Sequence, residues 1–279
     1  MQTTGALNQA PMVPPPITQI EHFRSQNVNA FRIPICWQRM QPKIMGELDP
    51  EYLKLLSQYV DHALASNASV IIDLHNYGRR DGKVIGEAGD LPSDSLVDIW
   101  RRLAQEFKRY YEVSFGIMNE PHDVNEDVWH GTLQAVVTAI RKTGATNKIL
   151  LSADNWSHLE TFANSYPGIS SIQNPDGSST GLIFELHEYF DSDSSGSNPE
   201  CTVPHTKDLK EVVTLLASEK RQAVITEFGG GNNPDCASVL AQFVQEANQN
   251  GEWVDQSNIN VVKKLFGAGG KTKRARRRH

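Results

Sequence analysis

The sequence predicts an α/β fold of the (β/α)8 TIM-barrel type. The first observation is a repeated alternation of short apolar strands with amphipathic helices, which is typical of a parallel sheet covered by helices. The second is that polar and aromatic residues gather at the carboxyl ends of nearly all the predicted strands. The third is the length of 279 residues with 39% hydrophobic residues, which is enough for one large domain with a sizeable core.

Six strands are expected from short apolar runs that are bounded by polar or turn residues. The clearest run is Val70, Ile71 and Ile72, which shows no alternation of apolar and polar residues. Strands of this kind are buried on both faces, as in a parallel sheet with helices outside. The predicted strands span residues 29–35, 68–76, 113–120, 148–156, 181–190 and 222–229.

A helix is expected after each strand, and one more helix is expected before the first. In residues 50–67, Asp49 is a favourable N-cap and Pro50 suits the first helical position. Leu53 and Leu56 then begin an apolar face at helical spacing. Gly144 is expected to end the helix before it. The predicted helices span residues 17–26, 50–67, 93–110, 125–144, 158–166, 206–220 and 234–250.

The strand ends decide between a barrel and an open sheet. A doubly wound sheet could also hold six strands, but it gathers its ligand at one switch point. A barrel draws functional groups from many strand ends around one mouth. Here such groups follow nearly every strand, which favours the barrel: Arg32, His75, Asn76, Asn119, Glu120, Asn155, Trp156, His187, Tyr189 and Glu227.

Charge and composition exclude several classes of protein. The net charge is −6, and the last nine residues carry six basic side chains and no acidic one. The remaining 270 residues therefore carry −12, which does not suggest a nucleic-acid partner. No apolar run reaches the ~18 residues of a membrane span, and residues 1–16 show no secretory signal pattern. The three cysteines form no CxxC or CxxH cluster, so we expect no structural zinc site.

Two carboxylates stand where packing gives no reason for a charge. Glu120 lies in the sequence GIMNEP and Glu227 in VITEFG, each at the end of an apolar strand. In a barrel the two would face each other across the mouth, where a pair of carboxylates can act as nucleophile and general acid/base in glycoside hydrolysis. The alternative is that each is a solvated or helix-capping acid.

Five motifs resemble those of glycoside hydrolase family 5, and most closely its fungal endo-β-1,4-glucanases. They are FRIP at residues 31–34, DLHNY at 73–77, FGIMNEPHD at 115–123, HEY at 187–189 and ITEFG at 225–229. The resemblance implies a (β/α)8 barrel and hydrolysis of β-1,4-glucosidic bonds with retention of configuration. It also implies that Glu120 is the acid/base and Glu227 the nucleophile. Mannanases and β-1,3-glucanases of the same family are near neighbours.

The resemblance also implies roles for the residues around the carboxylates. Asn119 would bond the sugar 2-OH, Arg32 would hold the nucleophile ionised, and His187 and Tyr189 would adjust the two glutamates. Trp156, with Trp37 and Tyr77 as further candidates, would stack on sugar faces; the alternative for these aromatic residues is a place in the core. The predicted substrate-binding residues are Arg32, His75, Asn76, Asn119, Trp156, His187 and Tyr189.

The cysteines and one loop complete the site predictions. The resemblance implies a Cys201–Cys236 disulfide and an extracellular protein, with Cys36 as a free thiol. Residues 191–196 imitate the start of a calcium loop, but position twelve is Thr202 rather than glutamate, so a flexible loop is favoured. We expect no metal or cofactor, a β-glucan ligand, no nucleic-acid or membrane partner, and a monomer if the chain folds.

The resemblance covers residues 17–253 and leaves the two ends outside it. Residues 1–16 are a proline-rich lead-in where the family has its first strand, and residues 254–279 form a basic tail where the family has its eighth. We therefore expect an incomplete barrel with strands two to seven recognisable and open edges that favour association. The alternatives are an inactive carbohydrate-binding remnant, a fragment that does not fold alone and, for the tail, a nuclear-localisation or nucleic-acid segment.

Overall fold

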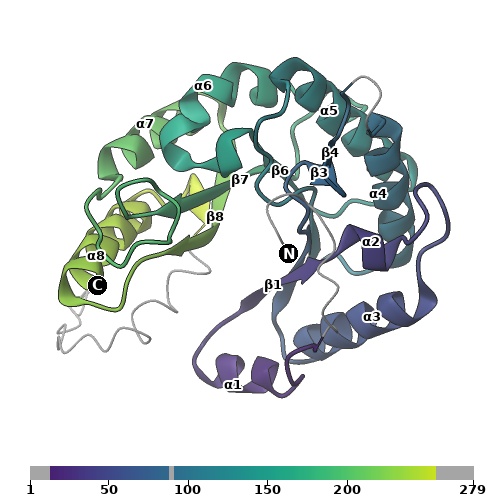
Figure 1. Ribbon diagram of the computed structural model, residues 1–279, viewed down its shortest axis with the longest axis horizontal. Helices are drawn as coiled ribbons and strands as arrows, with labels where there is room; N and C mark the ends of the chain where they lie inside the picture. Colours follow the sequence, from purple (N-terminus) through teal and green to yellow (C-terminus); the bar gives the residue numbers. More distant parts are fainter. Residues whose placement is uncertain (1–12, 88–90, 256–279) are drawn as a thin grey trace, which may run out of the picture.

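A computed structural model of the protein describes residues 13–87 and 91–255. Its centre is a seven-stranded sheet in the order β1-β2-β5-β6-β7-β8-β9, in which every neighbouring pair is parallel (Figure 1). The strands are β1 (Ala30–Ile35), β2 (Ser69–Leu74), β5 (Val113–Gly116), β6 (Ile149–Ser152), β7 (Leu182–Tyr189), β8 (Gln222–Gly229) and β9 (Val254–Asp255). A separate antiparallel hairpin is formed by β3 (Arg79–Arg80) and β4 (Lys83–Val84).

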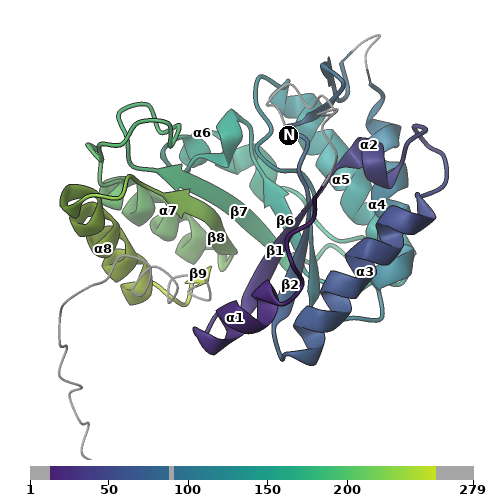
Figure 2. The same ribbon diagram turned by 60° about the horizontal axis from the view of Figure 1, so that its bottom comes forward.

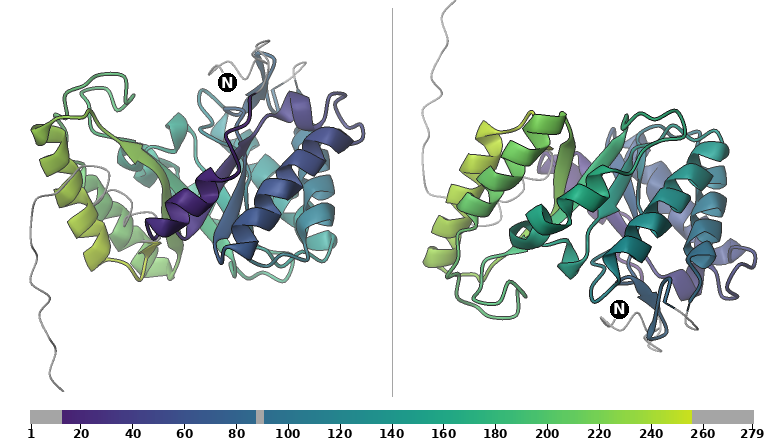
Figure 3. Two further views of the ribbon diagram at one scale, coloured as in Figure 1. Left: turned by 90° about the horizontal axis from the view of Figure 1, so that it is seen from below. Right: turned by 90° about the horizontal axis from the view of Figure 1, so that it is seen from above.

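Helices lie along the outer side of the curled sheet, and Figure 3 shows this arc from below and above. They are α1 (Gln19–Ser25), α2 (Trp37–Met40), α3 (Pro50–Ala65), α4 (Ser93–Phe107), α5 (Glu126–Lys142), the 3-10 turn η1 (Asn155–Ser157), α6 (Leu159–Ser170), α7 (Thr206–Glu219) and α8 (Pro234–Gln249). The alternation of strand and helix predicted from the sequence is confirmed, as is the α/β barrel-type fold.

Side-chain caps begin three of the long helices where the sequence places suitable residues. The Asp49, Asn125 and Asn233 side chains each accept a hydrogen bond from the backbone N–H three residues later. Such caps satisfy one of the free N–H groups at a helix start. Each cap follows the loop that leaves a strand, so it fixes the path of the chain from the strand end into the outer layer.

The core fills the space between the sheet and the helices. Its largest fully buried side chains include Trp100, Trp129, Phe115, Phe162 and Phe184. The indole N–H of Trp100 donates to the Ile117 carbonyl, and that of Trp129 donates to the Ser152 carbonyl. The two tryptophans therefore tie α4 and α5 to the backbone at the carboxyl ends of β5 and β6.

The curled sheet is open in the part of the chain that the structure describes. No hydrogen-bonded pairing there joins β9 back to β1, and Figure 2 shows β1 and β9 as the two end strands of the sheet. β9 corrects the sequence analysis, which expected no strand after Trp253. Two residues are too short to give a recognisable apolar pattern, but Ala223 and Val224 pair with them in register.

An apolar hollow of 380 Å³ lies along the free side of β1, and Arg32 is among the residues that line it. Its lining includes Pro15, Ile20, Phe31 and Tyr59, so it lies between α1, β1 and α3. Residues 13–16 of the expected lead-in form part of this lining, and the Tyr59 hydroxyl donates to the Pro15 carbonyl. The expected basic tail falls almost wholly on residues 256–279, outside the described residues.

Among the described residues, no helix is both long and apolar enough to cross a membrane.

Candidate active site

Glu120 and Glu227 come from opposite sides of the curled sheet and meet at its carboxyl ends. Glu120 follows β5 in a loop, and Glu227 lies within β8. The φ angle of Glu120 is 44°, in the left-handed region that favours glycine, so the loop holds this residue in a strained conformation. Oxygen atoms of the two carboxyl groups lie within 4.8 Å of each other.

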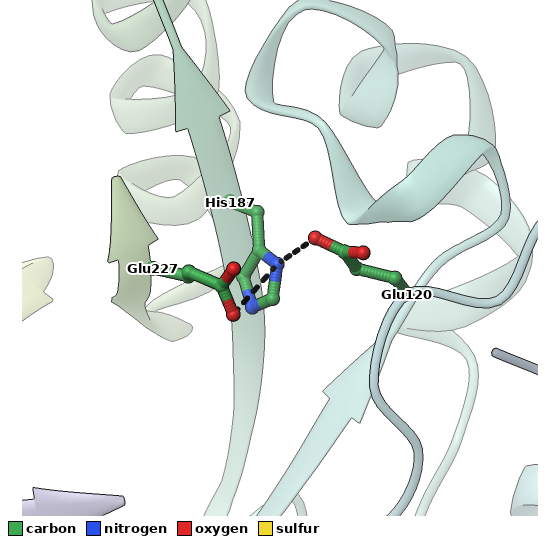
Figure 4. Close-up of side chains that lie close together, drawn as sticks. All are labelled: Glu120, His187 and Glu227. Atoms are coloured by element: carbon green, nitrogen blue, oxygen red, sulfur yellow. Dashed lines mark hydrogen bonds and ion pairs between the residues drawn. The ribbon is translucent and has the colours of Figure 1, made fainter. Parts of the chain in front are cut away.

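His187 of β7 lies between the two carboxylates, as Figure 4 shows. Its Nδ1 is 2.8 Å from Glu120 Oε1 and 3.9 Å from Glu227 Oε2. Burial lowers the pKa of His187, but hydrogen bonds to Glu120 and Glu185 outweigh it and raise this pKa to about 9. An imidazolium between the two carboxyl groups reduces their mutual repulsion.

Arg32 of β1 joins the nucleophile candidate to two buried carboxylates. Its guanidinium donates to Glu185 Oε1 at 3.1 Å and to Glu227 Oε2 at 3.2 Å, and its Nη2 is 3.1 Å from Asp73 Oδ1. Desolvation lowers the pKa of Arg32, but Asp73, Glu185 and Glu227 raise it above its ordinary value. The group therefore stays cationic beside Glu227.

Tyr189 supplies a second hydrogen bond to Glu227. The Tyr189 hydroxyl donates to Glu227 Oε1 at 2.7 Å, so each oxygen of this carboxylate has a protein donor. Burial raises the pKa of Glu227, but the charge of His187, the Tyr189 hydroxyl and Arg32 together lower it below its usual value. Glu227 is thus held ionised, which is the state a nucleophile requires.

Asn119 lies between Arg32 and the acid/base candidate. Its Oδ1 accepts a hydrogen bond from Arg32 Nη2 at 2.6 Å. Its Nδ2 is buried and has no acceptor among the described residues. An amide N–H fixed in this way is suited to donate to a ligand oxygen next to the two carboxylates.

Comparison with known proteins gives the family. The chain matches the family model described as Cellulase (glycosyl hydrolase family 5) over residues 9–262. The chain belongs to glycosyl hydrolase family 5. The match confirms the resemblance inferred from the five motifs and extends past Trp253. The proposed division of the chain at residues 17 and 253 stays a prediction.

Relatives within family 5 are endoglucanases. The chain is 43% identical over 235 residues to the "Manganese dependent endoglucanase Eg5A" of Phanerodontia chrysosporium, covering 82% of this chain and 60% of that protein. The crystal structure of Cel5A (EG2) from Hypocrea jecorina has a TM-score of 0.87 at 36% identity and covers 91% of this chain and 82% of that one. XacCel5A in complex with cellopentaose has a TM-score of 0.82 at 33% identity, covering 86% and 78%. The chain spans about three-fifths of the length of these curated relatives, 60% for the Phanerodontia chrysosporium protein and 58% for Endoglucanase EG-II of Hypocrea jecorina.

His75 and Tyr77 lie next to the Arg32 cluster in this family 5 chain. His75 Nδ1 is 2.8 Å from Asp73 Oδ2, and the Tyr77 hydroxyl is 3.3 Å from His75 Nε2. Burial, followed by the charges of Glu120 and Glu227, raises the pKa of Tyr77 to about 12. Tyr77 therefore keeps its proton and can act as a hydrogen-bond donor near the carboxylates.

One predicted sugar contact, Asn76, and one further candidate, Trp37, lie in the core. Asn76 is fully buried: its Oδ1 accepts from the Trp37 backbone N–H, and its Nδ2 donates to Gln38 and to the Arg79 carbonyl. Trp37 is also fully buried, with its indole N–H directed to Gln41. Neither side chain has a polar group or ring face left for a sugar, so Asn76 is corrected as a substrate-binding residue, and for Trp37 the alternative of a place in the core is confirmed.

Trp156 remains a candidate platform for a sugar ring. It is half-buried and stacks on His122 at 4.6 Å with an interplanar angle of 6°. Its φ angle is 57°, and both neighbours, Asn155 and Ser157, also have positive φ angles. Three successive left-handed residues are costly, which indicates that the η1 turn is held to present this ring.

The Cys201–Cys236 disulfide predicted from the resemblance is present, with a Cα–Cα distance of 4.9 Å. It links the segment after β7 to the first turn of α8. A β-carbon at Gly230 would lie 2.5 Å from Cys201 Sγ, so only glycine fits beside the bridge. Cys36 is the free cysteine and is partly buried.

A metal ion does not fit the central trio as arranged. Glu120, His187 and Glu227 offer donor atoms within 4.8 Å of one another. However, both Glu227 oxygens are engaged by Arg32 and Tyr189, and His187 carries a proton where a metal ligand needs a bare nitrogen. The guanidinium also places a positive charge beside the trio.

The loop after β7 satisfies its own carboxylate. Asp191 accepts hydrogen bonds from the backbone N–H groups of Gly196 and Asn198 and from two side chains, Ser195 and Asn198. Burial opposes the effect, but these backbone donors lower the pKa of Asp191 to about 2. Both oxygens of Asp191 already accept hydrogen bonds from the loop itself. This favours a loop held by its own hydrogen bonds over a calcium-binding loop.

Sequence reasoning missed the buried carboxylates around the site. Glu185 lies in the middle of β7, Asp73 is the penultimate residue of β2, and Glu188 lies between His187 and Tyr189. The available signal was a charge within an otherwise apolar strand. Such a charge is almost never fully buried unless it is paired.

Proposed function

We propose that the chain is a retaining endo-β-1,4-glucanase that acts on cellulose-type β-glucan. The observation that carries the proposal is the pair of carboxyl groups, Glu120 and Glu227, with oxygens within 4.8 Å. Retaining glycosidases hold their two carboxyls roughly 5–5.5 Å apart, whereas inverting enzymes need about 6.5–9.5 Å to admit a water. The endoglucanase names of the relatives, and the cellopentaose bound by XacCel5A, support this substrate class.

Glu227 would attack in the first step. One of its oxygens forms a bond to the anomeric carbon, and the bond from that carbon to the leaving oxygen breaks while Glu120 donates a proton to this oxygen. Arg32 and Tyr189 keep Glu227 ionised until attack. The product of the step is a covalent glycosyl ester on Glu227 and a free chain end.

Glu120 would act as the base in the second step. It removes a proton from water, the water oxygen bonds to the anomeric carbon, and Glu227 leaves as a carboxylate. His187 lies against Glu120 Oε1 at 2.8 Å and orients this carboxyl group through both steps. We propose that Asn119 donates to the sugar 2-OH and that Trp156 stacks on a neighbouring ring, while His75 bonds a further hydroxyl.

Paired carboxamide variants test the two roles. We expect Glu227→Gln to abolish hydrolysis of every substrate, because no ester can form. Glu120→Gln should abolish cellulose hydrolysis but spare the first step on an aryl β-cellobioside with a good leaving group, which needs little acid assistance. Glu211→Gln is a matched control, since this exposed carboxyl lies on α7 away from the site.

The stereochemical course is the decisive measurement. Proton NMR of the first products from a soluble cello-oligosaccharide should show the β-anomer, and a panel with mannan and β-1,3-glucan should show lower rates. The α-anomer as first product would reject the mechanism. Binding of cello-oligosaccharide without any hydrolysis would instead favour the carbohydrate-binding remnant.

We also propose that the protein acts outside the cell. The Cys201–Cys236 disulfide supports this location, because such bridges form and persist in oxidising compartments. Mass spectrometry of the protein after secretion from a fungal host, with and without alkylation of free thiols, should show one free cysteine. Three alkylated cysteines in the secreted protein would contradict this proposal.

A further inference from the structure

A second group of titratable residues lies on the outer side of β7, directly behind the candidate active site. Residues of a strand alternate between its two faces, so His187 and Tyr189 point to the site while Glu188 points to the helices. Glu188 is fully buried and is surrounded by groups from α6, the segment before it and the start of α7. The groups that act on Glu188 or lie next to it are Glu160, His205 and Asp208, and His158 lies 4.0 Å from Glu160.

The hydrogen bonds of this group leave room for one shared proton. His205 Nδ1 is 2.9 Å from Asp208 Oδ2, and a carboxylate oxygen accepts, so Nδ1 carries the hydrogen. The Nε2 of a neutral His205 is then a lone pair, and it faces Glu188 Oε1 at 3.5 Å. Two acceptors facing each other in a buried place repel, whereas one proton between them makes an attractive contact.

We propose that Glu188 is a positioning residue for the hydrolysis, which shares one proton with His205 and thereby holds the catalytic end of β7. The inference rests on the proposed function. Glu188 Oε1 accepts the Tyr189 backbone N–H at 3.1 Å, and the Tyr189 hydroxyl in turn donates to Glu227. Loss of the shared proton would therefore change the position of Tyr189, and through Tyr189 the hydrogen bonding of Glu227.

The local backbone makes this support necessary. The pairing of β7 with β8 shifts register between Leu186 and His187, so the regular ladder is interrupted where the catalytic end begins. Past this irregularity, the outer face is held by Glu188 and by Phe190, whose ring lies 5.9 Å from that of His205. An unpaired negative charge at Glu188 would be repelled by Asp208 in the first turn of α7, and this repulsion would displace the end of β7.

The surrounding charges set the direction of the pH effect. Burial raises the pKa of Glu188 most, Glu160 and Asp208 raise it further, and it reaches about 8 despite the backbone N–H donors of Tyr189 and Glu160. Glu188 thus keeps its proton near neutral pH and loses it in mildly alkaline solution. Burial lowers the pKa of His158, so this imidazole is neutral in the alkaline range where Glu188 ionises.

Glu188→Gln tests the proposal because glutamine is neutral and cannot ionise. Its oxygen can take the place of Oε1 and accept the Tyr189 backbone N–H, but it carries no proton to share with His205 Nε2. With each pH profile normalised to its own maximum, the alkaline limb of kcat/KM should move upward by about half a unit. A single ionisation changes activity tenfold per unit, so this is about a threefold gain at a given alkaline pH.

Two further variants and one spectroscopic signal separate a positioning role from mere packing. Glu160→Gln removes a carboxylate that raises the pKa of Glu188, so it should move the limb toward neutral pH, opposite to Glu188→Gln, whereas the exposed control Glu211→Gln should not move it. The Tyr189 amide signal in NMR should titrate between pH 7 and 9 in the wild type (about one unit either side of the Glu188 pKa) and stay fixed in Glu188→Gln.

The outcomes distinguish failure of the inference from failure of the proposed function. Superimposable normalised profiles for the wild type and Glu188→Gln would overturn the positioning role. A Tyr189 amide that titrates equally in both would overturn the shared proton. A protein without glucanase activity would refute the proposed function, while the amide titration would still decide whether Glu188 and His205 share a proton that acts on Tyr189.

Discussion

The hydrogen bond from Tyr189 to Glu227 gives the sharpest quantitative prediction about the site. Tyr189→Phe removes one oxygen and nothing else. The ring should stay in place, because it is packed closely: a β-carbon at Gly196 would lie 2.6 Å from Tyr189 Cδ1. The change therefore leaves Glu227 with Arg32 as its remaining direct donor among the described residues.

The size of the effect follows from the bond that is lost. The hydroxyl lies 2.7 Å from a carboxylate oxygen, and hydrogen bonds to charged groups contribute about 1.5–3 kcal/mol. The Glu227 side chain is 32% exposed, so solvent screening favours the low end of that range. One pKa unit is about 1.4 kcal/mol, so the pKa of Glu227 should rise by about one unit.

The sign of the pH effect is fixed by which state the hydroxyl stabilises. The bond favours ionised Glu227, so its loss makes protonation easier and moves the acid limb of kcat/KM toward neutral pH by about one unit. The assay is hydrolysis of an aryl β-cellobioside between pH 3 and 8, a range of about four units around the ordinary carboxyl pKa. Tyr77→Phe is the matched control, since its hydroxyl bonds to His75 rather than to Glu227. An acid limb that stays in place, or moves to lower pH, would refute the assignment of Tyr189.

Two further predictions concern the disulfide and the metal. The Cys201–Cys236 bridge closes a loop of 35 residues, so the Cys201→Ser, Cys236→Ser double variant should lose about 4 kcal/mol in free energy of unfolding measured with urea; an unchanged urea midpoint would show that the bridge contributes nothing. Because Arg32, Tyr189 and the proton on His187 already engage the central trio, dialysis against a chelator should leave kcat/KM unchanged. Loss of activity with EDTA and recovery with Mn²⁺ would show that the enzyme requires a metal, and would contradict this reading of the trio.

Strand ends were predictable because the barrel repeats one simple pattern. An apolar run followed by a polar residue marks the carboxyl end of a strand, and that rule located Glu120, whereas Arg32 and Glu227 lie within β1 and β8 rather than after them. Their convergence then depends on the sheet curling, since Arg32 and Glu227 lie 195 residues apart in sequence and yet form a hydrogen bond. The resemblance to family 5 supplied the roles, which residue type and spacing alone left open.

Buried polar residues escaped prediction because their partners lie far away in the chain. Asn76 looked like a ligand-binding group, but its amide caps the Trp37 backbone N–H 39 residues earlier. Trp37 looked available for stacking, but it begins α2 and is packed inside. For both, the local sequence reads the same whether the side chain faces a sugar or the core, so only tertiary packing decides.

Strand β7 shows how one segment can carry both the reaction and its support. Its inner face presents Glu185, which holds Arg32, followed by His187 and Tyr189, which contact the two catalytic carboxyl candidates. Its outer face presents Glu188 to the helices. Because adjacent residues share a backbone, a charge change on the outer face cannot be relieved without moving a residue of the inner face. The sensitivity of the site to substitutions on β7 should therefore follow burial and charge on both faces, rather than distance from the substrate alone.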